Sequence, residues 1–191
     1  MRGIIFTSFL DFLETELGLI GSERIIIQAE LSSGGAYTTV GFYDYKELLQ
    51  LITLSSPALN ATPNKVSQKF GAYLFHTLAA SSPQYFDGKK SCMELFEMIN
   101  DVIHTEVKSL YPEANPPQIH YERVNPSTAL LHYQSHRCLG DVMLGLIEGA
   151  GNYFCESLEI HRKKSNETGS KEVFTVIVLH KTKKQGARNP I

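Results

Sequence analysis

The sequence predicts an α+β domain in which a helical N-terminal part packs on a four-stranded antiparallel sheet with one embedded helix. Residues up to about 112 mainly show apolar side chains at helical spacing, whereas residues 113–181 mainly show the alternation typical of strands. The length of 191 residues suits one domain, and no internal repeat divides it. We expect this domain to span residues 1–181 and a basic, flexible tail to follow over residues 182–191.

Four amphipathic stretches predict helices in the first part of the chain. The first covers residues 6–18 and ends at Gly18, and the second covers residues 43–54. The third begins with Thr62 as N-cap and Pro63 at the first helical position. The fourth, over residues 91–112, is the clearest. Its apolar stripe consists of Phe96, Ile99, Ile103, Val107 and Leu110.

The pattern changes after "EANPP". Residues 117–124 and 128–137 alternate like two strands, and "NPS" forms the turn between them. Residues 139–154 return to helical spacing and provide the embedded helix. Residues 157–164 and 171–180 then predict a hairpin around "NETGS".

Composition excludes several classes of partner. The formal net charge is −2, which gives no electrostatic footprint for nucleic acid. No apolar run approaches the roughly 20 residues that span a bilayer, and the N-terminus does not fit a signal peptide. We therefore expect a cytoplasmic chain with neither nucleic acid nor a membrane as partner. Three cysteines, an odd number without close pairing, indicate reduced thiols.

His104 is the most informative of the seven histidines. On a helical wheel it lies at the margin of the apolar stripe, where a neutral imidazole can reach an apolar cavity and ligate a metal. The alternative is a partly exposed helix histidine without a special role, and periodicity alone favours that alternative.

The segment "LHYQSHR" places Tyr133, Ser135 and Arg137 on every second position, so a strand would direct all three to one face. A guanidinium with two hydroxyls suits a carboxylate. The alternative is a solvated strand end with Arg137 paired to a surface acid. A haem needs both features, since it requires an iron ligand and a place for two carboxylates.

The segments "DVIHTEVKSLYP", "NPPQI", "LHYQSHR" and "LGLIEG", in this order, resemble the H-NOX (haem-nitric oxide/oxygen binding) family. The family includes bacterial stand-alone sensors and the haem domain of soluble guanylate cyclase. The resemblance covers nearly the whole chain. It implies a haem b cofactor with His104 as the iron ligand, and Tyr133, Ser135 and Arg137 as binding residues for the propionates.

The resemblance also implies residues that contact the two faces of the haem. Pro117 would press on the macrocycle, and Ile5 would pack on the opposite face. The ligand-binding side would be lined by Val142, Leu146, Leu74 and Leu78. Oxygen-binding members carry a tyrosine at the position of Val142, and valine cannot donate a hydrogen bond to O₂. Tyr73 is the one local donor that would change this expectation if it pointed inward.

We therefore expect a sensor that is not an enzyme. Ferrous haem held by His104 would bind NO and CO and largely exclude O₂, and weakening of the iron–histidine bond would signal to a separate partner protein. Relatives suggest a histidine kinase or an enzyme that makes or degrades cyclic di-GMP as this partner. The alternative is a non-haem module that holds a carboxylate through Arg137, and a haem-dependent enzyme is a weaker third interpretation.

Some bacterial relatives bind a structural zinc near the C-terminus through cysteines and a histidine. Cys138 and His161 occupy two matching positions, but Lys164 and Glu172 stand where further thiols would be. Two ligands do not complete a tetrahedral site, so we expect no zinc.

Overall fold

A computed structural model of the chain describes residues 1–181, so the expected tail at 182–191 lies outside the described residues. The helices are α1 (Gly3–Gln28), α2 (Tyr45–Ser55), α3 (Pro63–Ser81), the short 3₁₀ helix η1 (Pro83–Tyr85), α4 (Cys92–Met98), the π-helical segment η2 (Ile99–His104), α5 (Thr105–Leu110) and α6 (Gly140–Tyr153). The strands are β1 (Gln118–Asn125), β2 (Thr128–Gln134), β3 (Glu156–Lys164) and β4 (Lys171–Lys181).

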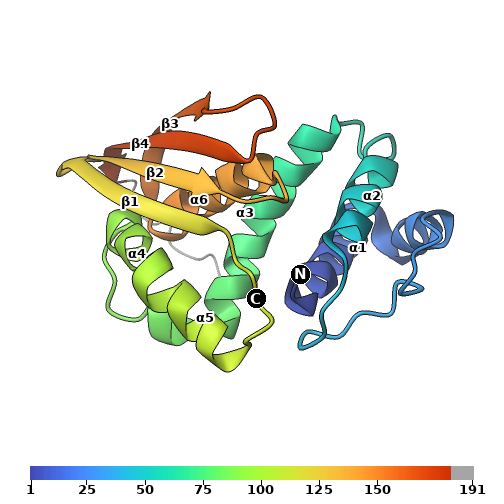
Figure 1. Cartoon of the computed structure of the whole chain (residues 1–191). Helices are drawn as coiled ribbons and strands as arrows, with labels where there is room; N and C mark the ends of the chain where they lie inside the picture. Colours follow the sequence, from blue (N-terminus) through green and yellow to red (C-terminus); the bar gives the residue numbers. More distant parts are fainter. Residues whose placement is uncertain (182–191) are drawn as a thin grey trace, which may run out of the picture.

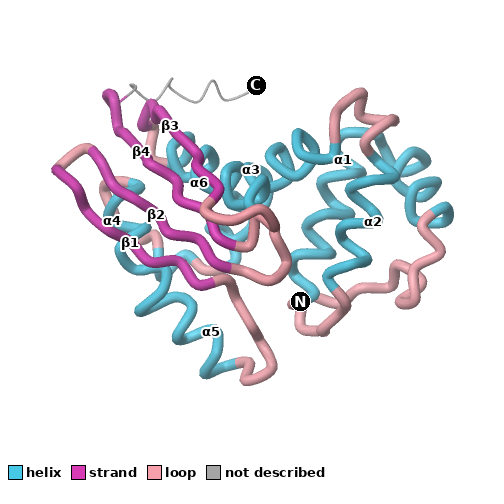
Figure 2. Tube along the Cα trace, turned by 45° about the horizontal axis from the view of Figure 1, so that its top comes forward, coloured by secondary structure: helices cyan, strands magenta, loops and turns pink. Residues whose placement is uncertain are grey.

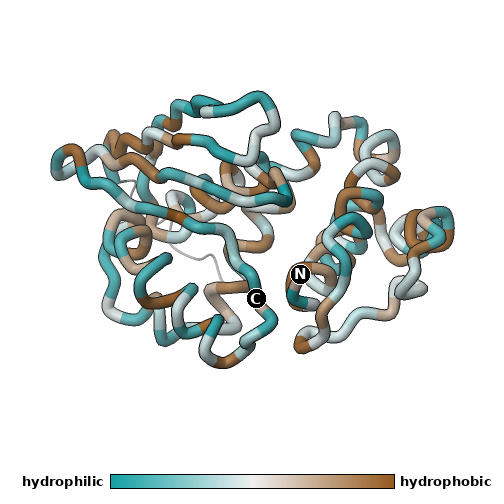
Figure 3. The backbone as a smooth tube through the Cα atoms, viewed as in Figure 1, coloured by the Kyte–Doolittle hydropathy of each residue, from teal (hydrophilic) through white to brown (hydrophobic). Residues whose placement is uncertain are grey.

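The four strands form one antiparallel sheet in the order β1-β2-β4-β3, as Figure 2 shows. Along β2, Ala129, Leu131 and Tyr133 are buried while the residues between them are only partly covered. One face of the sheet therefore covers the core formed with α4 and α6. Hydrophobic and hydrophilic residues alternate along the strands in Figure 3, and the turn between β3 and β4 is hydrophilic. The predicted α+β class is confirmed.

Helix α3 links two hydrophobic cores. One core joins the sheet to α4 and α6 and includes Phe75 and Ala79 of α3. The other core joins α1 and α2 and includes Val66, Phe70 and Leu74 of the same helix. In Figure 1, α3 accordingly lies between the α1–α2 pair and the half that carries the sheet.

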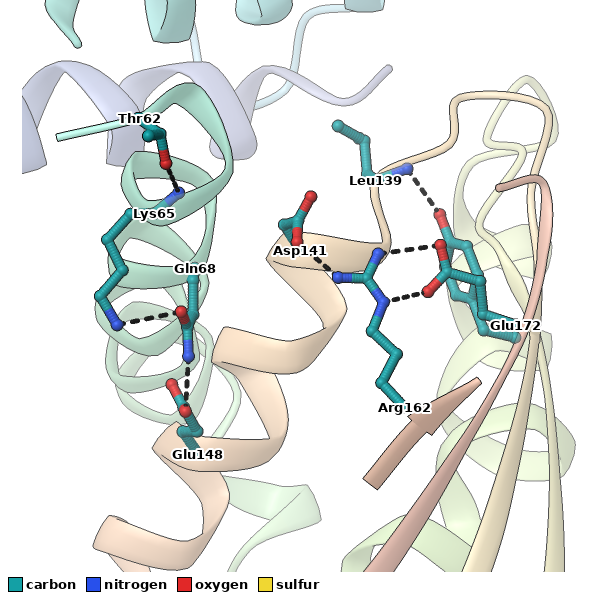
Figure 4. A network of polar contacts seen from close by, with 9 residues as sticks. Thr62, Lys65, Gln68, Leu139, Asp141, Glu148, Arg162 and Glu172 are labelled. Atoms are coloured by element: carbon teal, nitrogen blue, oxygen red, sulfur yellow. Dashed lines mark hydrogen bonds and ion pairs between the residues drawn. The ribbon is translucent and has the colours of Figure 1, made fainter. Parts of the chain in front are cut away.

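Helices α3 and α6 pack with their backbones in contact. A Cβ atom on Gly71 would lie 2.2 Å from the carbonyl oxygen of Val142, and one on Gly145 would lie 1.9 Å from that of Gln68. Only glycine permits this approach. Gln68 also donates a hydrogen bond of 2.6 Å to Glu148 across the same interface, shown in Figure 4. Helix α3 is therefore held firmly to α6.

Helix α1 is longer than the sequence predicts. Gly18 interrupts the helical backbone with φ 71° and ψ 170°, so the predicted end at this residue is confirmed for the first half. The chain then resumes helical geometry as far as Gln28. Ile20 and Ile27 in this second half are 69% and 76% exposed, so no apolar stripe marks the segment in the sequence.

The single helix predicted over residues 91–112 consists of α4, η2 and α5. A π-helical turn holds one residue more than an α-helical turn, so positions beyond it are rotated relative to those before it. The predicted apolar stripe fails at its end, where Leu110, the last residue of α5, is 65% exposed. The N-cap predicted for α3 is confirmed, because Thr62 accepts a hydrogen bond of 3.3 Å from the backbone N–H of Lys65 (Figure 4).

No helix within residues 1–181 combines the length and the apolar composition that crossing a membrane requires.

Candidate functional site

An apolar cavity of about 260 Å³ lies where α1, α3 and α6 meet the segment from η2 to β1. A second cavity of about 210 Å³ adjoins it and extends towards α4 and η1. Leu78, His104 and Leu146 line both cavities, so the two are neighbouring compartments of one hollow. An apolar hollow of this kind suits a large, flat, mostly apolar ligand.

All ten site residues predicted from the sequence line the first compartment. They are Ile5, Leu74, Leu78, His104, Pro117, Tyr133, Ser135, Arg137, Val142 and Leu146. The chain brings them together from α1, α3, η2, β2, α6 and the connections beside them. The location of these residues is therefore a structural finding, whereas their individual roles are predictions.

His104 ends the π-helical segment η2 and faces both compartments. Burial lowers the pKa of this histidine to about 4; the positive charge of Lys108 adds to the effect and the backbone of Pro117 opposes it. The ring is therefore neutral at pH 7, which is the form that ligates iron. Its Nδ1 atom is buried, and the ring interacts with the backbone of Pro117. An exposed helix histidine without a role would not have these properties.

Tyr133, Ser135 and Arg137 meet at the mouth of the first compartment, but a common strand face does not align them. Strand β2 ends at Gln134, so the prediction that the strand reaches residue 137 is wrong. The hydroxyl of Ser135 accepts a hydrogen bond of 3.2 Å from the backbone N–H of Arg137, which stabilises a turn at this place. The three side chains converge on the cavity through this turn.

Each member of this group is held by the surrounding backbone. Leu139 donates its N–H to the phenol oxygen of Tyr133 at 3.1 Å. Arg137 donates from Nη1 to the carbonyl oxygen of Asn115 at 2.6 Å. Its Nε atom is buried without a partner among the described residues, and burial lowers the pKa of the guanidinium. An anion that accepts from this nitrogen would satisfy it.

The side of the hollow formed by α3 and α6 offers apolar side chains. Leu74 and Leu78 come from α3, and Val142 and Leu146 come from α6. Tyr73 lines neither compartment; its ring packs 5.7 Å from that of Phe12. None of these four aliphatic side chains can donate a hydrogen bond.

Sequence reasoning missed several polar residues of the hollow, among them Tyr85 and Arg2. Tyr85 lines the second compartment, and its burial raises the pKa of the phenol. Arg2 lines both compartments and stacks on the ring of Tyr111 with its Cζ 3.8 Å from the ring centroid. Neither residue belongs to a motif, so the sequence contains no signal that would have identified it.

The position of Glu172, which the sequence comparison set against a zinc thiol, is occupied by a buried ion pair. Glu172 is 2% exposed and accepts two hydrogen bonds from Arg162, one of them 2.9 Å long from Nη2. Arg162 also donates to Asp141 at the start of α6, as Figure 4 shows. Within the described residues, no group of three or more histidine, cysteine, aspartate or glutamate side chains is placed to hold a metal ion.

An α+β fold around an apolar hollow that is lined by a neutral imidazole and a guanidinium suits a haem-binding domain. Comparison with family models agrees, because the haem-NO-binding family model matches residues 2–162. The chain belongs to this family, the H-NOX family of haem-based gas sensors.

Solved H-NOX structures are similar to the chain over nearly its whole length. The Fe(II) unliganded H-NOX protein from K. algicida is 31% identical with a TM-score of 0.87, and the match covers 97% of this chain and 100% of that one. An H-NOX protein from S. oneidensis in the Fe(II)NO state is 26% identical with a TM-score of 0.86, covering 94% and 100%. The H-NOX domain of Shewanella oneidensis in the Fe(II)CO state is 26% identical with a TM-score of 0.83, covering 93% and 98%. A comparison with curated protein sequences found no match.

Proposed function

We propose that this chain is a nitric oxide sensor whose haem b iron is held by His104. The observation that carries the proposal is the state of this histidine, which is neutral at pH 7 and lines both compartments of an apolar hollow. A neutral imidazole can ligate iron through one ring nitrogen while the other nitrogen interacts with a backbone carbonyl, and the backbone of Pro117 acts on this ring.

The remaining predicted residues would bind and orient the macrocycle. Tyr133, Ser135 and Arg137 would hold the propionates at the mouth, where the Nε atom of Arg137 is free to donate. Pro117 and Ile5 would pack on opposite faces of the ring. Leu74, Leu78, Val142 and Leu146 would line the side where a gas binds, and they would exclude water from it.

The choice of gas follows from these four aliphatic residues. Bound O₂ carries partial negative charge and is retained when a neighbouring group donates a hydrogen bond to it, whereas NO and CO need no such donor. Tyr73 is packed away from the hollow. We therefore propose that the protein binds NO and CO and largely excludes O₂. Solved relatives from S. oneidensis have been determined with NO and with CO.

Signalling would pass from His104 to the helices around it. A bound haem would supply the iron that binds NO, and His104 would hold that iron through a bond that NO binding would weaken. Release of His104 would free η2 and α5 to move relative to α3 and α6. A partner that binds the two arrangements with different affinity would respond to the change. We propose a histidine kinase or an enzyme of cyclic di-GMP synthesis or degradation as this partner.

Absorption spectra of the purified, haem-supplemented protein test the proposal. We expect a Soret band that shifts with NO and with CO but not with air. His104→Gly should lose most of its haem and regain it with imidazole. His76→Gly is the matched control, because His76 is an exposed helix residue outside both compartments.

Two results would contradict the assignment. Normal haem loading of His104→Gly without imidazole would show that another residue holds the iron. Absence of a Soret band in the haem-supplemented wild type would favour the carboxylate-binding module instead.

A further inference from the structure

Two buried arginine nitrogens lack a hydrogen-bond partner among the described residues: Nε of Arg2 and Nε of Arg137. Both belong to residues that line the first compartment of the hollow. The proposed function accounts for Arg137 but leaves Arg2 unexplained. Buried polar atoms in folded proteins are almost always partnered, so an unpartnered one beside a binding site points to a ligand.

The charged residues that line the hollow are positive, and this too points to a negatively charged ligand. Arg2, Arg137 and Met1 line the first compartment, while neither compartment is lined by an aspartate or glutamate of the described chain; the amino group of Met1 donates to the carbonyl oxygen of Tyr43. Burial, followed by the charge of Arg137, lowers the pKa of the Met1 amino group. Two permanent positive charges therefore face the hollow without a carboxylate in its lining. They suit a ligand that carries two negative groups.

The surrounding contacts hold Arg2 in place. Its backbone pairs with Phe42 in an isolated bridge just before α1. Its guanidinium lies over the ring of Tyr111, which follows directly after α5. Stacking uses the flat face of a guanidinium and leaves the N–H groups at its edge available for hydrogen bonds. Arg137 holds Asn115 a few residues further along the same connection, so the two arginines flank one segment.

From this arrangement we propose that Arg2 is a second binding residue for the haem carboxylates, so that Arg137 and Arg2 together neutralise both propionates. The inference rests on the proposed haem function. Through its stack on Tyr111, Arg2 also connects the edge of the hollow to the far end of α5, the helix that follows His104.

The rate at which haem transfers to excess apomyoglobin tests this role, measured for protohaem and for its dimethyl ester, which has no carboxylate charge. We expect Arg2→Ala to lose protohaem about tenfold faster than wild type, because a charged hydrogen bond contributes about 1.5 kcal/mol and 1.4 kcal/mol corresponds to tenfold. The same variant should lose the ester within about twofold of wild type. Arg2→Lys should recover part of the retention.

Arg24→Ala is the matched control, because Arg24 is an exposed arginine of α1, the helix that follows Arg2. It should release both haems at the wild-type rate. Equal acceleration for protohaem and its ester would overturn the proposal, since Arg2 would then act through packing. Unchanged release of protohaem would also overturn it. In both cases a normal Soret band and NO response of the wild type would leave the proposed function intact, whereas failure of the wild type to bind haem would remove both.

Discussion

Gly71 of α3 and Gly145 of α6 face each other where the two helices cross, and a Cβ atom on either would lie less than 3.0 Å from the Cα atom of the other. We expect Gly71→Ala and Gly145→Ala each to lower the free energy of unfolding by about 1–3 kcal/mol, the usual cost of overpacking. Urea denaturation of the apo protein measures this loss.

Asn152→Ala, at an exposed position of α6, is a suitable control and should change stability by no more than about 0.5 kcal/mol. If either glycine variant were as stable as wild type, the two helices could separate without cost. They would then not form the rigid unit that we describe.

Glu47 should make stability depend on pH in the acid range. It is 7% exposed and accepts hydrogen bonds from Ser33 at 2.6 Å and from Tyr37 at 2.7 Å. Burial raises the pKa of Glu47, but the hydrogen bonds from Ser32, Ser33 and Tyr37 outweigh burial and lower it below the usual value. The ionised form is thus favoured in the folded state. Its contribution is complete at neutral pH and is lost as pH falls through the folded pKa.

Glu47→Gln should therefore cost about 1–3 kcal/mol at pH 7 and progressively less below about pH 4. Denaturation of both proteins at several pH values measures the difference, and Glu14→Gln at an exposed site of α1 serves as control. A difference that stays constant from pH 7 to pH 3 would contradict this assignment.

The buried pair of Glu172 and Arg162 should be sensitive to loss of one partner. Glu172→Gln removes the charge opposite a guanidinium that is only 21% exposed, and we expect a loss of about 3 kcal/mol in unfolding free energy. Replacing both residues, as Arg162→Met with Glu172→Leu, should cost less, because the one partner left behind, Asp141, is 24% exposed and can be hydrated. If the double variant were less stable than Glu172→Gln, the pair would stabilise the fold through more than the neutralisation of each charge by the other.

Val142 decides the response to oxygen in our proposal. Val142→Tyr would place a hydrogen-bond donor beside the proposed gas-binding position, so the variant should give a stable O₂ spectrum in air where wild type does not. Val142→Phe has nearly the same size without the hydroxyl and should not retain O₂. Retention of O₂ by the phenylalanine variant would mean that steric effects, rather than a hydrogen bond, control binding.

Much of the site could be predicted because short segments of the sequence resemble the H-NOX family. His104 lies in one such segment, although periodicity alone favoured a histidine without a special role, and the group from Tyr133 to Arg137 occupies another. The predicted geometry of that group was wrong. A hydrogen bond between Ser135 and the backbone of Arg137 turns the chain out of the strand, and the alternating pattern does not show this.

Other features depend on contacts between distant segments. Arg2 reaches the hollow because Phe42 and Tyr111 fix its position, and neither contact leaves a trace near the N-terminus of the sequence. The second half of α1 exposes Ile20 and Ile27, so its periodicity does not reveal a buried face. The π-helical turn at Ile99–His104 leaves no signature in the sequence. The apolar residues around it keep the spacing of an ordinary α-helix, so the extra residue of the turn cannot be recognised from the pattern.

The π-helical turn at Ile99–His104 has a mechanical consequence. A π-helical turn contains one residue more than an α-helical turn. If the turn converted to α geometry, the helix that follows it would shift by one residue, which is about 1.5 Å along the helix axis and roughly 100° around it. Thr105, Glu106 and Lys108 would then present a different edge to the outside. If the proposed bond between His104 and iron broke, this conversion would move α5 by a combined rotation and translation at the molecular surface.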